Sequence, residues 1–253
     1  MLAPILLLPK VLALADRAGA VILEHYAGEI VAATKADRSP VTEADEAAER
    51  VILAGLAELT PDIPVVAEEA AAKGGLPELR GGRFWLVDPL DGTREFLSKN
   101  GEFTVNIGLV DDGVPIMGVV TAPAKNLAWW GARGQGSCRR EGSDVGDIRV
   151  RARPASGVVA VASRSHRDAA TDAWLAAQGI TDTVSAGSSL KFCLVAEGKA
   201  DAYPRFGTTM EWDTAAGHAV LLGAGGRVST VAGEPFRYAK PGFKNPGFIA
   251  EGG

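Results

Sequence analysis

The sequence predicts an α+β half followed by an α/β half, and three observations lead to this expectation. The first part of the chain contains two segments whose apolar residues recur with the period of a helix. Alternating apolar segments with turn signals follow, which predict antiparallel sheet. Beyond them, strand-like and helix-like segments alternate, the order that builds a parallel or mixed sheet with crossover helices. We therefore expect an N-terminal half over residues 1–153 and a C-terminal half over residues 154–253.

Length and composition are those of an ordinary globular protein. At 253 residues with 47% hydrophobic content, the chain can bury a core as one large domain or two smaller ones. The net charge of −5, with scattered basic residues, argues against a nucleic-acid polymer as partner. Two cysteines are too few for a disulfide framework, so we expect a cytoplasmic location and leave peripheral contact with the inner membrane open. No apolar run approaches the roughly 20 residues that span a bilayer.

Two helices are predicted at the start of the chain. Residues 1–20 are apolar and contain Ala13-Leu14-Ala15, so a signal peptide is the alternative to a helix that continues through residue 28. The helix is favoured because no basic region precedes the apolar run, Pro9 and Lys10 interrupt it, and the amphipathic pattern continues beyond it. A second helix is predicted from Thr42, since Asp45 three residues later completes a T-x-x-D start signal. Its apolar face comprises Val51, Ile52, Leu56 and Leu59.

The strands of the first half are short or contain turn signals. Residues 63–70 predict a strand that ends in two glutamates. Phe84 to Val87 form an apolar run that suits a strand buried on both faces. Residues 103–123 alternate and turn at Asp-Gly, the mark of a β-hairpin, and residues 126–140 add a further strand. In the second half, strands are predicted over residues 157–165, 182–187 and 200–206, and helices over residues 167–179, 188–198 and 211–226.

Asp88 and Asp91 follow the strand over Phe84 to Val87 and flank Pro89. Because proline cannot extend a sheet ladder and Gly92 permits a tight backbone, the chain is expected to turn between the two carboxylates. One interpretation is an ordinary turn, since Asp-Pro and Asp-Gly are common turn dipeptides. The other is a site for a hard cation, because close carboxylates repel unless positive charge lies between them. Oxygen ligands of this kind suit Mg²⁺ or Mn²⁺.

Three more acids occupy similar positions. Glu68 is expected at a strand end, Asp45 in the first turn of a helix, and Asp213 at the start of the helix over residues 211–226. Each has a purely structural alternative: Asp213 as an N-cap, Asp45 as a capping acid that matches the helix dipole, and Glu68 as a solvated strand end. Their occurrence together with the Asp88 region favours a metal site.

The second half carries candidate anion-binding residues. Ser188 and Ser189 are expected to open a helix with Lys191 in its first turn. The alternative is a capped helix with a solvated lysine. A lysine there opposes the helix dipole, which an anion nearby would explain. His166 follows a strand at its carboxyl end, where α/β sheets place ligands, and Arg205 lies in the segment YPRFG.

These motifs resemble those of a known superfamily. DPLDGT, AEE and WDTAAG are similar to the metal motifs of the inositol monophosphatase superfamily, whose members are Mg²⁺-dependent, lithium-sensitive phosphomonoesterases. SPVTEAD, LDGTREF, NGEFTVNIGLV, GSSLKFCLVAEG and YPRFG resemble its bacterial 3'(2'),5'-bisphosphate nucleotidase branch, which serves sulfur assimilation. The resemblance covers almost the whole chain and departs at Ala67, where many relatives have serine. It implies a layered α/β/α/β/α sandwich.

The resemblance also implies roles for single residues. Glu68, Asp88 and the carbonyl of Leu90 would hold one Mg²⁺, and Asp88, Asp91 and Asp213 a second. A third, weaker ion would touch Glu68, and Mn²⁺ could substitute. Thr93 and Asp45 would orient and deprotonate the attacking water. Substrate contacts would come from Gly92 and Thr93 amides, from His166, Ser188, Lys191 and Arg205, and from the metal-site residues Glu68, Leu90, Asp91 and Asp213.

The implied activity is hydrolysis of adenosine 3',5'-bisphosphate to AMP and phosphate, the work of a phosphoric monoester hydrolase. The alternative is an inositol monophosphatase or a fructose 1,6-bisphosphatase-like broad phosphatase. A non-catalytic metal- or nucleotide-binding regulator is a further alternative, against which the intact Asp45 and Thr93 weigh. The partner would be a small nucleotide, and the enzyme would be a monomer or homodimer.

Overall fold

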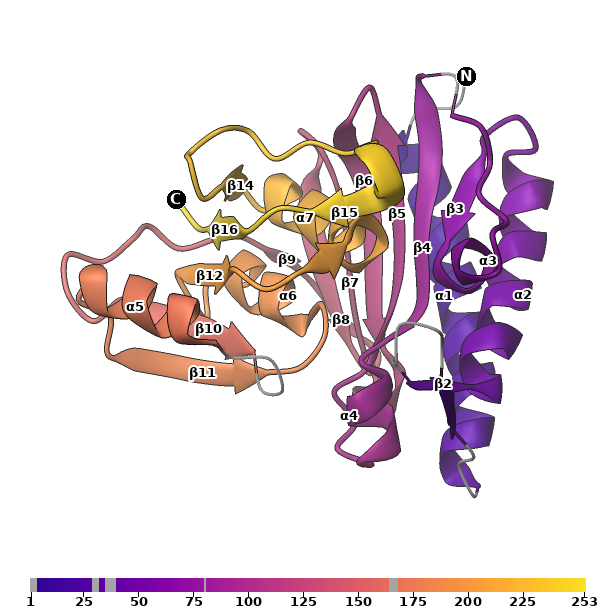
Figure 1. Cartoon of the computed structure of the whole chain (residues 1–253), viewed down its shortest axis with the longest axis horizontal. Coiled ribbons are helices and arrows are strands. Elements are labelled where there is room, and N and C mark those ends of the chain that lie inside the picture. The colour runs from indigo at the N-terminus through magenta and orange to yellow at the C-terminus, as the bar shows by residue number, and fades with distance from the viewer. Residues whose placement is uncertain (1–3, 29–31, 35–39, 80, 164–167) are drawn as a thin grey trace.

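A computed structural model describes residues 4–28, 32–34, 40–79, 81–163 and 168–253. The elements stack in five layers, which confirms the predicted α/β/α/β/α sandwich (Figure 1). Helices α1 (Pro4–Ala27) and α2 (Glu43–Leu59) cover one face of a seven-stranded sheet. Helices α6 (Leu190–Ala196) and α7 (Glu211–Gly223) lie between this sheet and a five-stranded sheet. Helix α5 (Ala169–Ala177) covers the outer face of the second sheet.

The seven-stranded sheet has the order β3-β4-β5-β6-β7-β8-β9 and is antiparallel except for the parallel pair β3–β4. Its strands are β3 (Val65–Ala67), β4 (Arg83–Asp91), β5 (Thr104–Asp111), β6 (Val114–Ala122), β7 (Leu127–Ala132), β8 (Gly136–Glu141) and β9 (Asp144–Ile148). The predicted hairpin turn is confirmed, because Asp112 and Gly113 both have positive φ, of 46° and 74°, as a tight hairpin loop requires.

The five-stranded sheet has the order β11-β10-β12-β16-β14, so the last strand of the chain lies between two earlier ones. Its strands are β10 (Val159–Ser163), β11 (Asp182–Ala186), β12 (Ala202–Arg205), β14 (Arg227–Thr230) and β16 (Phe248–Glu251). Two short ribbons complete the sheets, β1 (Ala32–Thr34) with β2 (Pro40–Thr42), and β13 (Thr209–Met210) with β15 (Lys244–Asn245). The remaining elements are the helices α3 (Glu68–Ala72) and α4 (Thr93–Leu97), and the 3₁₀ turns η1 (Pro123–Lys125) and η2 (Pro241–Phe243).

Strand β4 divides the core. Phe84 and Leu86 point into a cluster that also contains α6, α7 and residues of the second sheet, whereas Trp85 and Val87 point into the cluster with α1 and α2. This explains the continuous apolar run, and the predicted burial on both faces is confirmed. The cluster shared between the two sheets spans the predicted boundary at residue 153, so the division into two halves stays a prediction.

Several predicted elements differ from the structure. Strand β4 does not end at Val87 but continues through Asp91, because a register shift between Asp88 and Asp91 accommodates Pro89, which has no N–H for the ladder. The strand expected over residues 63–70 ends at Ala67, and Glu68 begins α3. Residues 126–140 form two strands, β7 and β8, rather than one. Among the described residues, no helix has the length and apolar content needed to cross a membrane.

Helix α7 lies unusually close to the first sheet, and glycines permit this approach. A Cβ atom at Gly118 would stand 2.3 Å from the carbonyl oxygen of Ala216, and one at Gly108 would stand 2.9 Å from the nitrogen of the same residue. Such distances exclude any side chain on β5 or β6 at these points unless the helix moves. The two glycines therefore set the distance between the sheet and the helix that carries Asp213.

Candidate active site

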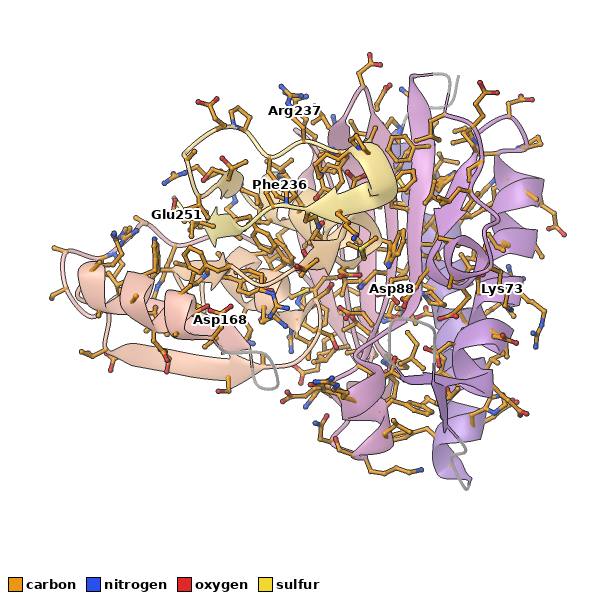
Figure 2. All side chains as sticks on the ribbon, in the orientation of Figure 1. Lys73, Asp88, Asp168, Phe236, Arg237 and Glu251 are labelled. Atoms are coloured by element: carbon orange, nitrogen blue, oxygen red, sulfur yellow. The ribbon has the colours of Figure 1, made fainter. Side chains whose placement is uncertain are left out.

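The end of β4 brings two predicted metal ligands to the interior. Asp88 is buried, and its Oδ1 accepts a hydrogen bond of 3.0 Å from the backbone N–H of Leu90. Figure 2 shows Asp88 inside the molecule, on the part of β4 that leads toward α4. The predicted turn between Asp88 and Asp91 is wrong: the strand continues to Asp91, and the chain turns at Gly92, whose φ is 91°. Helix α4 then begins at Thr93.

Asp45 and Thr93 lie together although they are 48 positions apart in the chain. Asp45 is the third residue of α2, and its Oδ2 accepts the backbone N–H of Thr42 at 2.8 Å and the Thr42 hydroxyl at 2.7 Å, which confirms the predicted start signal. The other oxygen, Oδ1, lies 3.5 Å from the Thr93 hydroxyl, a long hydrogen bond. The two predicted catalytic residues therefore lie within reach of each other, and their catalytic role stays a prediction.

Three glutamates lie around the start of α3. Glu68, expected at a solvated strand end in the structural alternative, is half-buried, and Glu69 beside it is buried. The backbone N–H of Glu69 donates to Oε2 of Glu49 on α2 at 2.8 Å. Burial raises the pKa of Glu49 to about 7; repulsion from Glu69 and Glu68 acts in the same direction, and the hydrogen bond from the Glu69 N–H opposes it. Sequence reasoning missed Glu49, because its position in α2 reads as an ordinary helix surface.

Asp213 is the third residue of α7, not its N-cap. Its Oδ2 accepts the backbone N–H of Met210 at 2.8 Å, so it satisfies the helix start from inside the first turn. Burial, followed by repulsion from Asp91 and Glu68, raises the pKa of Asp213 well above the usual range. Burial also raises the pKa of Asp91, although the positive charge of Lys191 acts in the opposite direction. The positive charge near Asp91 and Asp213 is thus too small to offset the burial that disfavours their ionised forms.

This acidic region suits a hard cation chemically. The described residues include no group of three His, Cys, Asp or Glu side chains already arranged as a metal site. The proposed donors are nevertheless all oxygen atoms, which Mg²⁺ prefers, and a cation would relieve the repulsion between Asp91, Asp213 and Glu68. The residues present therefore fit such an ion, and the ligand set stays a prediction.

A cavity of about 260 Å³ opens beside these acids, between the end of β4, α6, β12 and α7. Its lining contains the acids Asp91, Glu95 and Asp213 and the cations Lys191 and Arg205. It unites seven predicted site residues, Asp91, Gly92, Thr93, Ser188, Lys191, Arg205 and Asp213. Four other predicted residues do not line it: Asp45, Glu68, Asp88 and Leu90.

Lys191 is buried rather than solvated, which contradicts the structural alternative. Its side chain is only 5% exposed, its Nζ donates to the carbonyl of Ser188, and Nζ lies 5.4 Å from the ring centroid of Tyr203. Burial lowers the pKa of Lys191 to about 8, an effect that Asp91 opposes and Arg205 increases. Two cations that repel each other inside one cavity are suited to an anion.

We expected Ser188 to contact the substrate, but its hydroxyl lies against backbone carbonyl oxygens. Its hydroxyl lies 2.8 Å from the carbonyl oxygen of Asp91 and 2.7 Å from that of Glu102. Its φ of 49° lies in the left-handed region, which is uncommon for a residue other than glycine. A contact to substrate from Ser188 stays a prediction. His166 lies outside the described residues.

Besides Glu49, sequence reasoning missed four residues at this site, Glu95, Asn106, Ser189 and Tyr203. Glu95 and Tyr203 line the cavity, and both are buried. Glu95 belongs to the motif LDGTREF that carried the family resemblance, so a signal existed without a role attached to it. Asn106 gave a weaker signal as a polar residue in an apolar strand, and Ser189 read only as a helix start.

Comparison with known proteins identifies the family. The model of the inositol monophosphatase family matches residues 8–248. The chain belongs to the inositol monophosphatase family. This confirms the predicted family, whose members are metal-dependent phosphatases.

Individual relatives indicate which branch of the inositol monophosphatase family the chain resembles. It is 50% identical over 246 residues to the 3'(2'),5'-bisphosphate nucleotidase CysQ of Escherichia coli (strain K12), covering 96% of this chain and 98% of the relative. It is 36% identical over 235 residues to the histidinol-phosphatase of Mycobacterium tuberculosis (strain ATCC 25618 / H37Rv), covering 88% and 86%. The crystal structure of CysQ from Bacteroides thetaiotaomicron superimposes with a TM-score of 0.80 at 40% identity and covers 94% of each chain. The predicted nucleotidase branch is therefore confirmed as the nearest group among these relatives.

Proposed function

We propose that this protein is a 3'(2'),5'-bisphosphate nucleotidase that hydrolyses adenosine 3',5'-bisphosphate to AMP and phosphate. Relatives that carry the nucleotidase name at 50% identity over nearly the whole chain support this assignment. The observation that carries it is the lining of the cavity, which contains the carboxylates Asp91 and Asp213, proposed as metal ligands, together with the cations Lys191 and Arg205. A substrate with two phosphates can use both kinds of group at once, whereas a phosphomonoester has no second anion for the cations.

We assign the metal-binding role to the side chains of Glu68, Asp88, Asp91 and Asp213 and to the carbonyl of Leu90. Two or three Mg²⁺ ions are proposed, and Mn²⁺ would substitute. When bound, such ions neutralise phosphate oxygens and make a water more acidic. The raised pKa values of Asp91 and Asp213 support this role, because a cation favours the ionised form that burial disfavours.

Thr93 and Asp45 are assigned to the attacking water. Thr42 holds Oδ2 of Asp45 through two hydrogen bonds, which leaves Oδ1 directed at the Thr93 hydroxyl at 3.5 Å. A water hydrogen-bonded to Thr93 would be oriented toward the phosphorus, and its proton would pass toward Oδ1 of Asp45. The backbone amides of Gly92 and Thr93 are proposed to bind oxygens of the phosphate that is hydrolysed.

Lys191 and Arg205 are assigned to the retained 5'-phosphate. Lys191 with a pKa of about 8 is mostly charged at neutral pH, and Arg205 supplies a second cation. Their mutual repulsion in the cavity falls when an anion lies between them. His166 and Ser188 are proposed as further nucleotide contacts.

A broader phosphatase is the second candidate. The relative named histidinol-phosphatase has 36% identity, so members with this degree of similarity carry a name for a different substrate. Inositol 1-phosphate and fructose 1,6-bisphosphate belong to the same alternative. A cytoplasmic location, which the two free cysteines Cys138 and Cys193 support, and a monomeric or homodimeric state stay predictions.

Substrate comparison tests the assignment. We expect kcat/KM for adenosine 3',5'-bisphosphate to exceed those for inositol 1-phosphate, fructose 1,6-bisphosphate and histidinol phosphate. Lys191→Ala and Arg205→Ala should raise KM for the bisphosphate far more than for a small phosphomonoester, because a remote cation acts only on a substrate with a remote anion. Lys199→Ala is the matched control, since this lysine is exposed and outside the cavity. Equal efficiency on all four substrates, or equal losses for both substrate types, would favour the broad phosphatase.

A further inference from the structure

The hydroxyl of Ser189 is directed away from the helix that it begins. Ser189 is the N-cap residue of α6, yet its side chain makes no capping hydrogen bond. Instead its Oγ lies 3.1 Å from Oδ2 of Asp91 and 2.8 Å from the carbonyl oxygen of Asp213. The residue is buried. A serine that could cap its own helix thus contacts two proposed metal ligands from different elements.

Asn106 supports this serine from the middle of β5. Its side chain is fully buried, and its Nδ2 donates to Oγ of Ser189 at 2.9 Å and lies 3.4 Å from Oδ2 of Asp91. Its Oδ1 has no hydrogen-bond partner among the described residues. A buried amide that is only half satisfied costs stability, so apolar packing does not explain an asparagine at this position.

The donors and acceptors fix the direction of the chain of hydrogen bonds. Asn106 donates to the oxygen of Ser189, so the single hydroxyl proton is available for Asp91 or for the carbonyl of Asp213. An ionised carboxylate is the stronger acceptor. Both Ser189 and Asn106 approach the same oxygen of Asp91, Oδ2, so a cation would meet the other oxygen.

The neighbouring residue Ser188 contacts the backbone carbonyl of Asp91. Its hydroxyl lies 2.8 Å from the carbonyl oxygen of Asp91, while that of Ser189 reaches the carboxylate. Ser188 has a left-handed φ of 49°, and its hydroxyl also lies 2.7 Å from the carbonyl oxygen of Glu102, so its one proton is shared between two acceptors. The adjacent serines therefore contact Asp91 at two points, the carbonyl and the carboxylate.

We propose that Ser189 and Asn106 are positioning residues that orient the Asp91 carboxylate for a divalent cation: Asn106 donates to the oxygen of Ser189, and the Ser189 hydroxyl donates its one proton to Oδ2 of Asp91. This inference rests on the proposed metal site. Protein groups that hydrogen-bond to metal ligands fix the orientation of those ligands, and their loss commonly lowers metal affinity by about 10–100-fold. Neither residue touches the substrate or the cation itself.

Mn²⁺ binding provides a readout that does not depend on activity. Free Mn²⁺ is measured by electron paramagnetic resonance during titration of the wild type, Ser189→Ala and Asn106→Ala. We expect each variant to bind Mn²⁺ at least about tenfold more weakly. We also expect kcat of each variant to recover toward the wild-type value as Mn²⁺ is raised, because the catalytic groups remain. Thr121→Val is the control: this buried hydroxyl on β6 lacks a hydrogen-bond partner among the described residues, and its removal should leave Mn²⁺ affinity unchanged.

The outcomes separate this inference from the proposed function. If Asp91→Asn loses Mn²⁺ binding while Ser189→Ala and Asn106→Ala keep wild-type affinity, the positioning role is overturned and the metal site stands. If the wild type binds no Mn²⁺, or Asp91→Asn binds it normally, both are overturned. Should Ser189→Ala not fold, as judged by circular dichroism, Asn106→Ala decides alone, since it leaves the serine hydroxyl in place. Loss of activity that raised Mn²⁺ does not restore also contradicts the positioning role.

Discussion

Asp45 uses its two carboxylate oxygens for different purposes. Oδ2 accepts both hydrogen bonds from Thr42 and so stabilises the start of α2, and Oδ1 faces Thr93. The capping role, considered at first as an alternative to catalysis, is confirmed, and it is compatible with the proposed catalytic role. Capping even assists that role, because it removes the rotational freedom of the side chain.

Thr93→Ala tests the role of this pair. The variant loses the hydroxyl that would orient the attacking water, while the proposed metal ligands stay in place. We expect kcat to fall by at least about a hundredfold. Mn²⁺ affinity, measured by the same titration, should stay within about twofold of the wild-type value. A tenfold loss of Mn²⁺ affinity would instead make Thr93 part of the metal site.

The raised pKa of Glu49 predicts that the free energy of unfolding depends on pH. Its pKa in the folded protein is about 7 against an ordinary value of 4.5, so in this window the folded state keeps a proton that the unfolded state loses. The free energy of unfolding should therefore fall as pH rises from 4.5 to 7, by an amount on the order of 1–2 kcal/mol from this group. Glu49→Gln keeps an acceptor for the Glu69 N–H. It should remove the contribution of Glu49 to the decrease in the free energy of unfolding as pH rises.

Urea unfolding in metal-free buffer at both ends of this pH window measures the effect. Glu46→Gln is the matched control, because Glu46 is on the same helix but is a surface acid paired with Lys73. The control should follow the wild type. Identical pH profiles for Glu49→Gln and the wild type would show that Glu49 is ionised in the folded protein.

At the scale of elements, the position of α7 determines where Asp213 lies. Gly118→Ala introduces a methyl group where the structure leaves only 2.3 Å to the carbonyl oxygen of Ala216. We expect a loss of about 1–3 kcal/mol in the free energy of unfolding, as for other overpacked cores. Displacement of α7 should also weaken Mn²⁺ binding, since it moves one proposed ligand away from the others.

Gly146→Ala is the control for this substitution. Gly146 also lies in a strand of the same sheet, β9, but a Cβ atom there would meet nothing within 4 Å. Its stability and Mn²⁺ affinity should match the wild type or exceed it slightly. If Gly118→Ala is as stable and binds Mn²⁺ as well as Gly146→Ala, the helix is not held at a fixed distance by the glycines.

Elements that depend on neighbours in sequence could be predicted, and those that depend on distant neighbours could not. The Asp112-Gly113 turn and the contact between Thr42 and Asp45 are local, and both are confirmed. The burial of Lys191 and the raised pKa of Glu49 arise from segments far away in the chain. The predicted end of β4 was wrong for a related reason, because only its neighbour β5 determines whether a strand continues past a proline.

The candidate site shows the same difference between features that depend on neighbours in sequence and features that depend on distant segments. The motifs identified the acids and Thr93, because chemistry and a family resemblance pointed to those residue types. Asn106 and Ser189, which contact Asp91 and Asp213, gave at most a weak signal in the sequence: a polar residue in an apolar strand and a helix start. Their importance is visible only where β5, the start of α6 and the start of α7 meet.

For the whole molecule, the shared core predicts one cooperative unfolding transition. The cluster around α6 and α7 contains residues from both sheets, for example Phe84 and Leu86 of the first and Tyr203 and Phe248 of the second. We expect calorimetry to show a single transition, with equal calorimetric and van't Hoff enthalpies. Mg²⁺ should raise its midpoint in a concentration-dependent manner, and Asp213→Asn should reduce that rise. Two separate transitions would support independent halves on either side of residue 153.

The strand order of the second sheet constrains the order of events during synthesis. Strands β12 and β14 do not pair with each other, because β16 lies between them and pairs with both. We therefore expect the sheet to stay in two pieces until β16 has been synthesised. Arg205, at the end of β12, pairs with Phe248 of that strand. The wall of the cavity that carries Arg205 should consequently form late, and an incomplete chain should expose the open edge of β12.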